Sequence, residues 1–203
     1  MGSIVGWMLG ISASVAALVL VAALKLDNTN LAYLHMAIAA CVSIFIALAA
    51  SRELRHPGPT ASPELLASVG ARYLGMIWTW GALALIITYA FVLPWREWWH
   101  FSLVFVALAG ACLFLSATLR KDAESGADDD TMFKLARILI RIHFGAAIIT
   151  VIGLIADGKM VRFLVPRHQD WAAQNIFFFG AIALGMISWY TLVAMKAAQP
   201  AKS

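Results

Sequence analysis

Long apolar windows alternate with short polar segments along the whole chain. Five windows of roughly 20 residues contain no Asp, Glu, Lys or Arg, and they cover residues 4–24, 31–51, 73–93, 101–119 and 175–195. One helical crossing of a bilayer needs about 20 predominantly apolar residues. Each of the five windows therefore predicts a transmembrane helix.

A sixth window, 135–156, is less uniform, because Arg137, Arg141 and His143 lie in its first half. Its second half is fully apolar, and we predict that it also spans the membrane. With helical flanks included, the predicted spans are 4–24, 31–51, 68–93, 98–119, 135–156 and 171–195. They occupy almost the whole chain. The sequence thus predicts an all-α, polytopic membrane protein, a single domain (1–203) built as a bundle of six transmembrane helices with short loops.

Polar residues in the connections predict where helices begin and end. Residues 56–59 contain two prolines and cannot continue a helix. Ser62 and Pro63 then form a start signal, since Ser can cap a helix and Pro is tolerated at its first position. We expect the third helix to begin near Pro63, before it enters the membrane. Residues 159–165 are predicted to form a short helix along the membrane surface.

Composition and charge predict where the protein is located and how it is oriented in the membrane. Hydrophobic residues make up 62% of the chain and charged residues 13%, about half the charge of a typical soluble domain. Of the 15 Lys and Arg residues, nine fall on one side of the predicted membrane, five on the other, and Arg141 lies inside a helix. Basic residues favour the cytoplasmic side. We predict a bacterial inner (cytoplasmic) membrane protein with both termini in the cytoplasm and with the uncharged first window retained as a span.

The positions of the acidic residues argue against some functions. All 11 Asp and Glu residues lie in loops or at helix ends, whereas ion-coupled carriers usually keep an ionisable group inside the membrane. A proton- or sodium-coupled transporter is therefore disfavoured. The chain contains no phosphate-binding loop, nucleophile elbow or HExxH motif, so nucleotide-driven and hydrolytic chemistry has no support.

Two histidines are candidate cofactor ligands. His35 and His100 both lie about one turn inside the non-cytoplasmic end of their spans, at similar depths. Two neutral imidazoles at one depth can ligate the iron of haem b, or bind copper or zinc with a third ligand. Alternatively, each is a half-solvated interfacial histidine. A quinone site beside Gln174 and Asn175 is a further hypothesis.

Three deeper side chains need hydrogen-bond partners. His143 has no histidine at a matching depth, so we expect a buried, hydrogen-bonded residue rather than a ligand. Trp78 and Trp80 lie deeper than the interfacial tryptophans, and a buried indole N–H requires an acceptor.

A basic stripe and several glycines complete the candidates. Lys134, Arg137 and Arg141 recur every three or four residues, on one helix face. They are predicted to contact an anionic lipid or an acidic partner at the cytoplasmic face, or to act only as topological anchors. Glycines in the apolar windows predict a tightly packed bundle; they are Gly6, Gly10, Gly75, Gly81, Gly145, Gly153, Gly180 and Gly185.

The function expected from these features is interaction rather than catalysis. We predict a non-catalytic accessory or assembly partner of a larger membrane complex, because the sequence lacks a charged pathway and a catalytic set. The first alternative is a small redox membrane protein that binds haem or quinone through His35 and His100. The second is a facilitative transporter or channel that uses Trp78, Thr79 and Trp80.

Overall fold

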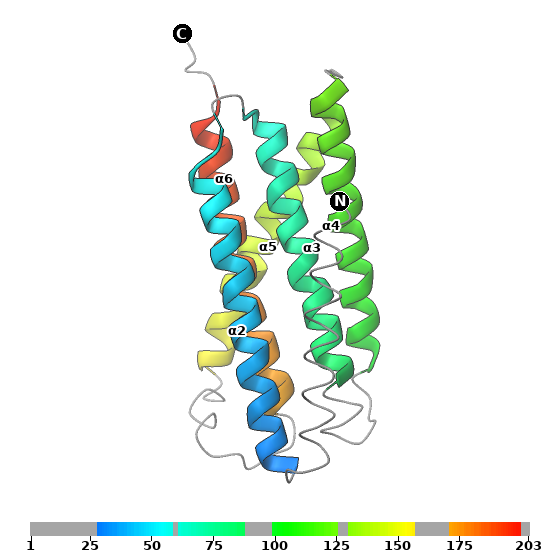
Figure 1. Cartoon of the computed structure of the whole chain (residues 1–203), viewed down its shortest axis with the longest axis vertical. Coiled ribbons are helices and arrows are strands. Elements are labelled where there is room, and N and C mark those ends of the chain that lie inside the picture. Colours follow the sequence, from blue (N-terminus) through cyan, green and yellow to red (C-terminus); the bar gives the residue numbers. More distant parts are fainter. Residues whose placement is uncertain (1–27, 59–60, 88–98, 126–129, 157–170, 200–203) are drawn as a thin grey trace.

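The computed structural model describes residues 28–58, 61–87, 99–125, 130–156 and 171–199 (Figure 1). Within the helices, the side chains of residues 28–33, 35–36, 87, 99–101 and 171–176 lie outside this description. The five helices are α2 (Asn28–Arg55), α3 (Pro63–Ile87), α4 (Trp99–Ser125), α5 (Asp130–Ala156) and α6 (Trp171–Ala197). The described part of the chain contains no β-strand.

All five helices are long and apolar enough to cross a membrane. The all-α class and the bundle of membrane-compatible helices agree with the sequence prediction, and α2 to α6 overlap the last five predicted spans. Residues 88–93 and 98 of those spans lie outside the described residues. The first predicted span, 4–24, and the predicted surface helix, 159–165, lie outside the described residues.

The start of α3 confirms the capping prediction. The backbone N–H of Leu65 donates to the hydroxyl of Ser62 at 3.2 Å, and the N–H of Leu66 donates to the Ser62 carbonyl at 3.0 Å. Pro63 is the first helical residue, where its missing N–H removes no helical hydrogen bond. Local sequence therefore determines where this helix begins.

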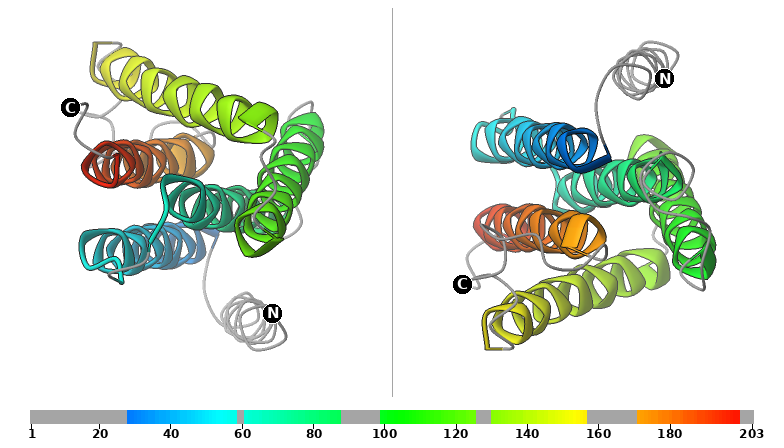
Figure 2. Two further views of the ribbon diagram at one scale, coloured as in Figure 1. Left: turned by 90° about the horizontal axis from the view of Figure 1, so that it is seen from above. Right: turned by 90° about the horizontal axis from the view of Figure 1, so that it is seen from below.

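Helices α3 and α6 lie at the centre of the bundle. α3 packs against all four other described helices, and α6 packs against α2, α3 and α5. Viewed along the bundle, α3 lies between α2 and α4, while α5 covers the opposite side of α6 (Figure 2). α5 starts near the end of α4 and then diverges from it. α2 and α4 do not form one of the packed helix pairs.

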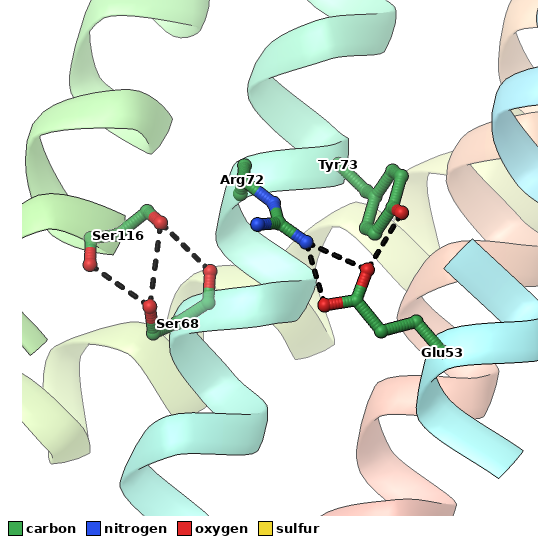
Figure 3. Close-up of polar contacts among 5 residues, drawn as sticks. All are labelled: Glu53, Ser68, Arg72, Tyr73 and Ser116. Atoms are coloured by element: carbon green, nitrogen blue, oxygen red, sulfur yellow. Dashed lines mark hydrogen bonds and ion pairs between the residues drawn. The ribbon is translucent and has the colours of Figure 1, made fainter. Parts of the chain in front are cut away.

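The α3–α4 interface is close because glycine and serine line it. A Cβ atom added to Gly75 would lie 2.7 Å from the Leu113 side chain, and one added to Gly81 would lie 2.9 Å from the Phe105 ring. The hydroxyl of Ser68 donates to the Ser116 carbonyl at 3.0 Å, and the Ser116 hydroxyl donates to the Ser68 carbonyl at 2.8 Å (Figure 3). Small residues of this kind let transmembrane helices approach and hydrogen-bond directly.

The glycine prediction holds at some positions and is wrong at others. Gly75 and Gly81 are contact sites, and a Cβ on Gly185 would lie 3.3 Å from Ala147. Added Cβ atoms at Gly145, Gly153 and Gly180 meet nothing within 4 Å, because these positions face the outside of the bundle or a cavity. Gly6 and Gly10 lie outside the described residues. Gly70, which the sequence analysis did not single out, packs directly against Thr191 of α6.

The outer surface of the bundle is apolar. α5 buries only Ala136, Ile140, His143 and Ala147, and its exposed side chains include Ile138, Ile142, Ile148, Ile149, Ile152 and Ile155. A soluble protein rarely exposes such a continuous apolar face. Its composition matches a surface that contacts lipid.

Candidate functional site

A pocket lies among the described residues, and all five described helices line it. Its volume is about 310 Å³, near the lower end of the range for small-molecule sites, about 300–1,000 Å³. Gly81, Leu108 and Leu184 contribute to its wall, and each lies close to the middle of its apolar window. The pocket is therefore located at the mid-depth of the predicted spans.

Two hydrogen-bonded side chains, Trp78 and His143, contribute polar atoms to this pocket. The indole N–H of Trp78 donates to Nε2 of His143 at 2.8 Å. Nδ1 of His143 lies 2.8 Å from the carbonyl oxygen of Leu139, one turn earlier in α5. His143 is 5% exposed. The expectation of a buried and hydrogen-bonded His143 is confirmed.

These two contacts determine the tautomer of His143. A carbonyl oxygen can only accept a hydrogen bond, so the proton of the ring is on Nδ1. The indole N–H can only donate, so Nε2 carries a free electron pair. His143 is thus neutral, and its single acceptor atom, Nε2, is directed at Trp78 of α3.

Aromatic rings form one wall of the pocket. The Trp78 and Phe105 rings meet edge to face with centroids 4.7 Å apart, and Phe105 meets Phe177 in the same way at 5.5 Å. All three residues line the pocket. Edge-to-face packing is favourable between aromatic rings, so this wall is a continuous aromatic surface contributed by α3, α4 and α6.

The pocket opens between α4 and α5. Val104 of α4 and Ala146 of α5 both line it and are both exposed, Val104 by 51%. These two helices make few direct contacts compared with the α3–α4 pair. In a membrane, exposed apolar side chains at this depth face lipid, so the opening leads laterally toward the bilayer.

Trp80 also has the partner that its depth demands. Its indole N–H donates to the carbonyl of Ala39 in α2 at 3.3 Å. The expectation that both deep tryptophans need acceptors is confirmed. Thr79, by contrast, bonds to Gly75 of its own helix at 2.8 Å and does not line the pocket.

The proposed His35–His100 site remains a prediction. Both residues belong to described helices, α2 and α4, but their side chains lie outside the described residues, as do those of Gln174 and Asn175. α3 lies between α2 and α4 (Figure 2). No group of three or more His, Cys, Asp or Glu side chains suited to a metal ion occurs among the residues that the structure describes.

The three residues of the basic stripe on α5 lie in different surroundings. Lys134 forms an ion pair with Asp130 at 2.8 Å, one turn away. Arg137 is half-buried and Arg141 is exposed, with Ile138 and Ile142 exposed beside them. Arg137 and Arg141 therefore lie on or near the lipid-facing surface of α5.

A second polar cluster joins α2 to α3 and α6, and the sequence analysis did not foresee it. Nη2 of Arg72 donates to both carboxylate oxygens of Glu53 at 2.7 Å, and the Tyr73 hydroxyl donates to Oε2 at 2.7 Å (Figure 3). Arg55 bonds to the Tyr190 hydroxyl and lies 4.5 Å from that ring centroid. Glu53 compensates the charge of Arg72, and together with the Arg55–Tyr190 contact this pair indicates a structural clamp that joins α2 to α3 and α6.

The comparisons with known proteins provide no relative for this chain. Searches against protein-family models, curated proteins and solved structures find no match. The pocket geometry therefore carries the functional argument by itself.

Proposed function

We propose that this protein binds a lipophilic small molecule inside the membrane, in the pocket that Trp78, Phe105, His143 and Phe177 line. The observation that carries the proposal is the pocket itself, an apolar cavity of about 310 Å³ at the mid-depth of the bundle. Apolar walls with a small number of placed polar groups are typical of small-molecule sites. The ligand enters from the bilayer through the opening between α4 and α5.

The pocket volume limits the size of the ligand. A protein cavity of about 150 Å³ holds one benzene molecule. The present cavity is about twice as large, so it accommodates a single substituted ring or a short branched chain. A longer hydrocarbon tail extends through the lateral opening into the lipid. A porphyrin is too large for this volume, so any haem would have to bind elsewhere, for example at His35 and His100.

We further propose the orientation expected from the basic residues. The α2–α3 connection and the end of α6 lie at the same end of the bundle (Figure 1), and Arg52, Arg55 and Lys196 are located there. The preference of basic residues for the cytoplasm supports placing this end, with the C-terminus, inside the cell. A bacterial inner membrane is the corresponding location.

A cavity-filling variant tests the binding function. Gly180 lines the pocket, and its added Cβ meets nothing within 4 Å. Gly180→Leu is expected to fold normally and to lose binding of 4-pentyltoluene, a lipophilic probe of suitable size. In the wild type, saturation at about 100 times Kd stabilises by about 2.7 kcal/mol, which raises the unfolding midpoint by about 5–10 °C in a chain of this size.

Gly153→Leu is the matched control. Gly153 is equally open at Cβ but exposed, and it does not line the pocket. This variant should show the same thermal shift with the probe as the wild type. Unchanged stabilisation of the Gly180→Leu protein by the probe would remove the proposed function.

The accessory-subunit function remains a prediction, and native mass spectrometry addresses both hypotheses. Protein extracted mildly from its own membrane is expected to carry an added ligand mass below that of a phospholipid. Partner chains at fixed stoichiometry would support the accessory role and identify the complex. A bare 22.0 kDa chain would contradict tight binding of either kind and direct attention to transport.

A further inference from the structure

Trp78 and His143 present complementary hydrogen-bonding atoms inside the pocket. The indole Nε1–H donates and cannot accept, while Nε2 of His143 accepts and carries no proton, because Nδ1 donates to Leu139. The two atoms are 2.8 Å apart and satisfy one another. A ligand whose polar group bonds to both of these atoms must therefore separate the pair and replace the lost bond on both sides.

We propose that the ligand is a ring-bearing lipophilic alcohol or phenol whose hydroxyl group enters between Trp78 and His143. This inference rests on the proposed binding function. A hydroxyl oxygen accepts from the indole N–H while its proton is donated to Nε2. One bond is broken and two are made, and each polar atom of the pair keeps a partner.

Other head groups leave the site unsatisfied. A carbonyl or an ether oxygen accepts from Trp78 but offers no proton to His143, so Nε2 becomes a buried acceptor without a donor. A carboxylate or an ammonium group would bring a charge to the middle of the bundle, and no described Asp, Glu, Lys or Arg lines the pocket to compensate it. A neutral group that both donates and accepts fits best.

The structure provides room for this insertion. Two hydrogen bonds of about 2.8 Å to one oxygen place the nitrogens about 5 Å apart, so they must separate by about 2 Å. α5 carries His143 and is held by a narrow stripe that includes Ala136, Ile140 and Ala147. α5 packs mainly against α6 and makes few contacts with α3 and α4. A small pivot of this helix on α6 therefore separates the pair without disturbing the α3–α4 interface.

The aromatic wall defines the rest of the ligand. Phe105 and Phe177 line the pocket together with Trp78, and aromatic faces and edges favour a ring placed against them. The remaining substituents point toward Val104 and Ala146, at the lateral opening. A ring with a hydroxyl at one end and a hydrocarbon tail at the other satisfies the volume, the wall and the polar pair.

The test compares two probes of the same shape, 4-pentylphenol and 4-pentyltoluene, on the wild type and on the double variant Trp78→Phe/His143→Phe. The phenol is expected to gain about tenfold in relative affinity in the wild type, the value of about one net hydrogen bond. The double variant should abolish this gain, because it retains neither the indole donor nor the imidazole acceptor. This affinity gain is modest because Trp78 and His143 stay hydrogen-bonded to each other when 4-pentyltoluene is bound. A site whose polar atoms were left unpaired by the wrong ligand would discriminate more strongly.

A second measurement needs no variant of His143. In protein labelled with ¹⁵N-tryptophan, the indole N–H signal of Trp78, assigned by its loss in Trp78→Phe, should shift further with the phenol than with 4-pentyltoluene, which acts on it only through its ring current. Equal relative affinities in wild type and variant, with no selective shift, would overturn the hydroxyl inference while leaving the pocket intact. Failure of both probes to bind the wild type would instead remove the proposed function.

Discussion

The α3–α4 interface and the contact surface of α5 show two ways of packing membrane helices. α4 buries a stripe spaced by three and four residues, which includes Ser102, Phe105, Ala109, Cys112, Ser116 and Leu119, and glycines on α3 let the two backbones approach closely. α5 has a shorter stripe of the same spacing. Only 17% of its span is buried, compared with 56% for α3.

Side-chain size accounts for the difference. Between α3 and α4, small residues permit contact and direct serine bonds. Beside α5, the rings of Trp78, Phe105 and Phe177 hold the helices apart, and the pocket occupies the remaining space. The α3–α4 pair thus forms the closely packed part of the bundle, and α5 covers the proposed ligand site.

The largest expected effect comes from enlarging a glycine of the closely packed α3–α4 pair. Gly75→Leu would force α3 away from Leu113, and overpacking of this kind costs about 3 kcal/mol. The separation can be followed by thiol labelling of Cys112, which is fully buried, in a Cys41→Ala background. Labelling should begin at a temperature several degrees lower than without the glycine substitution.

Gly145→Leu on α5 is the control for this comparison, because its added Cβ meets nothing within 4 Å. It should leave the labelling temperature of Cys112 unchanged. Equal effects at Gly75 and Gly145 would mean that the two surfaces are packed alike.

An intermediate effect with opposite signs is expected from two serine substitutions. Ser116→Ala removes one of the two reciprocal bonds to Ser68 and should destabilise by about 0.6 kcal/mol, the average for hydrogen bonds between membrane helices. Ser188 is fully buried, and its hydroxyl has no partner among the described residues. Ser188→Ala should therefore stabilise slightly, since an unsatisfied buried hydroxyl is costly. Thermal unfolding in detergent measures both, and the same sign for both would contradict the assignment of these bonds.

The smallest effect concerns the outer surface of α5. Arg141→Gln should reduce retention of phosphatidylglycerol relative to phosphatidylcholine about fivefold in native mass spectrometry, because a basic residue near a membrane surface contributes about 1 kcal/mol toward anionic lipid. Arg120→Gln is the control, since Arg120 already pairs with Glu124 at 2.8 Å. An equal loss in both variants would show that only total charge matters.

Much of the fold was predictable because hydropathy and capping act locally. The apolar windows correspond to α2 through α6, and Ser62 with Pro63 marks the start of α3. The need of Trp78 and Trp80 for acceptors, and of His143 for partners, also followed from their depth. The identity of those partners did not, because Trp78 and His143 are 65 residues apart in the chain.

The pocket could not be predicted from the same reasoning. Phe105, Phe177 and Gly180 are ordinary residues of apolar windows, and no local signal marks them as lining a cavity. Gly180 was expected to mark close packing and instead borders empty space. Whether a glycine serves as a contact or as an opening depends on the helix opposite it.

Neighbouring residues alone specify that the chain forms long membrane-compatible helices and that α3 begins at Pro63, because hydropathy and capping are local properties. The tertiary structure alone decided which faces meet, and with them the Ser68–Ser116 bonds, the Glu53–Arg72 clamp and the Trp78–His143 pair. The physical reason is that lipid and protein interior are equally apolar. A membrane helix is therefore hydrophobic on all sides, and its sequence carries no polar face to show which side is buried.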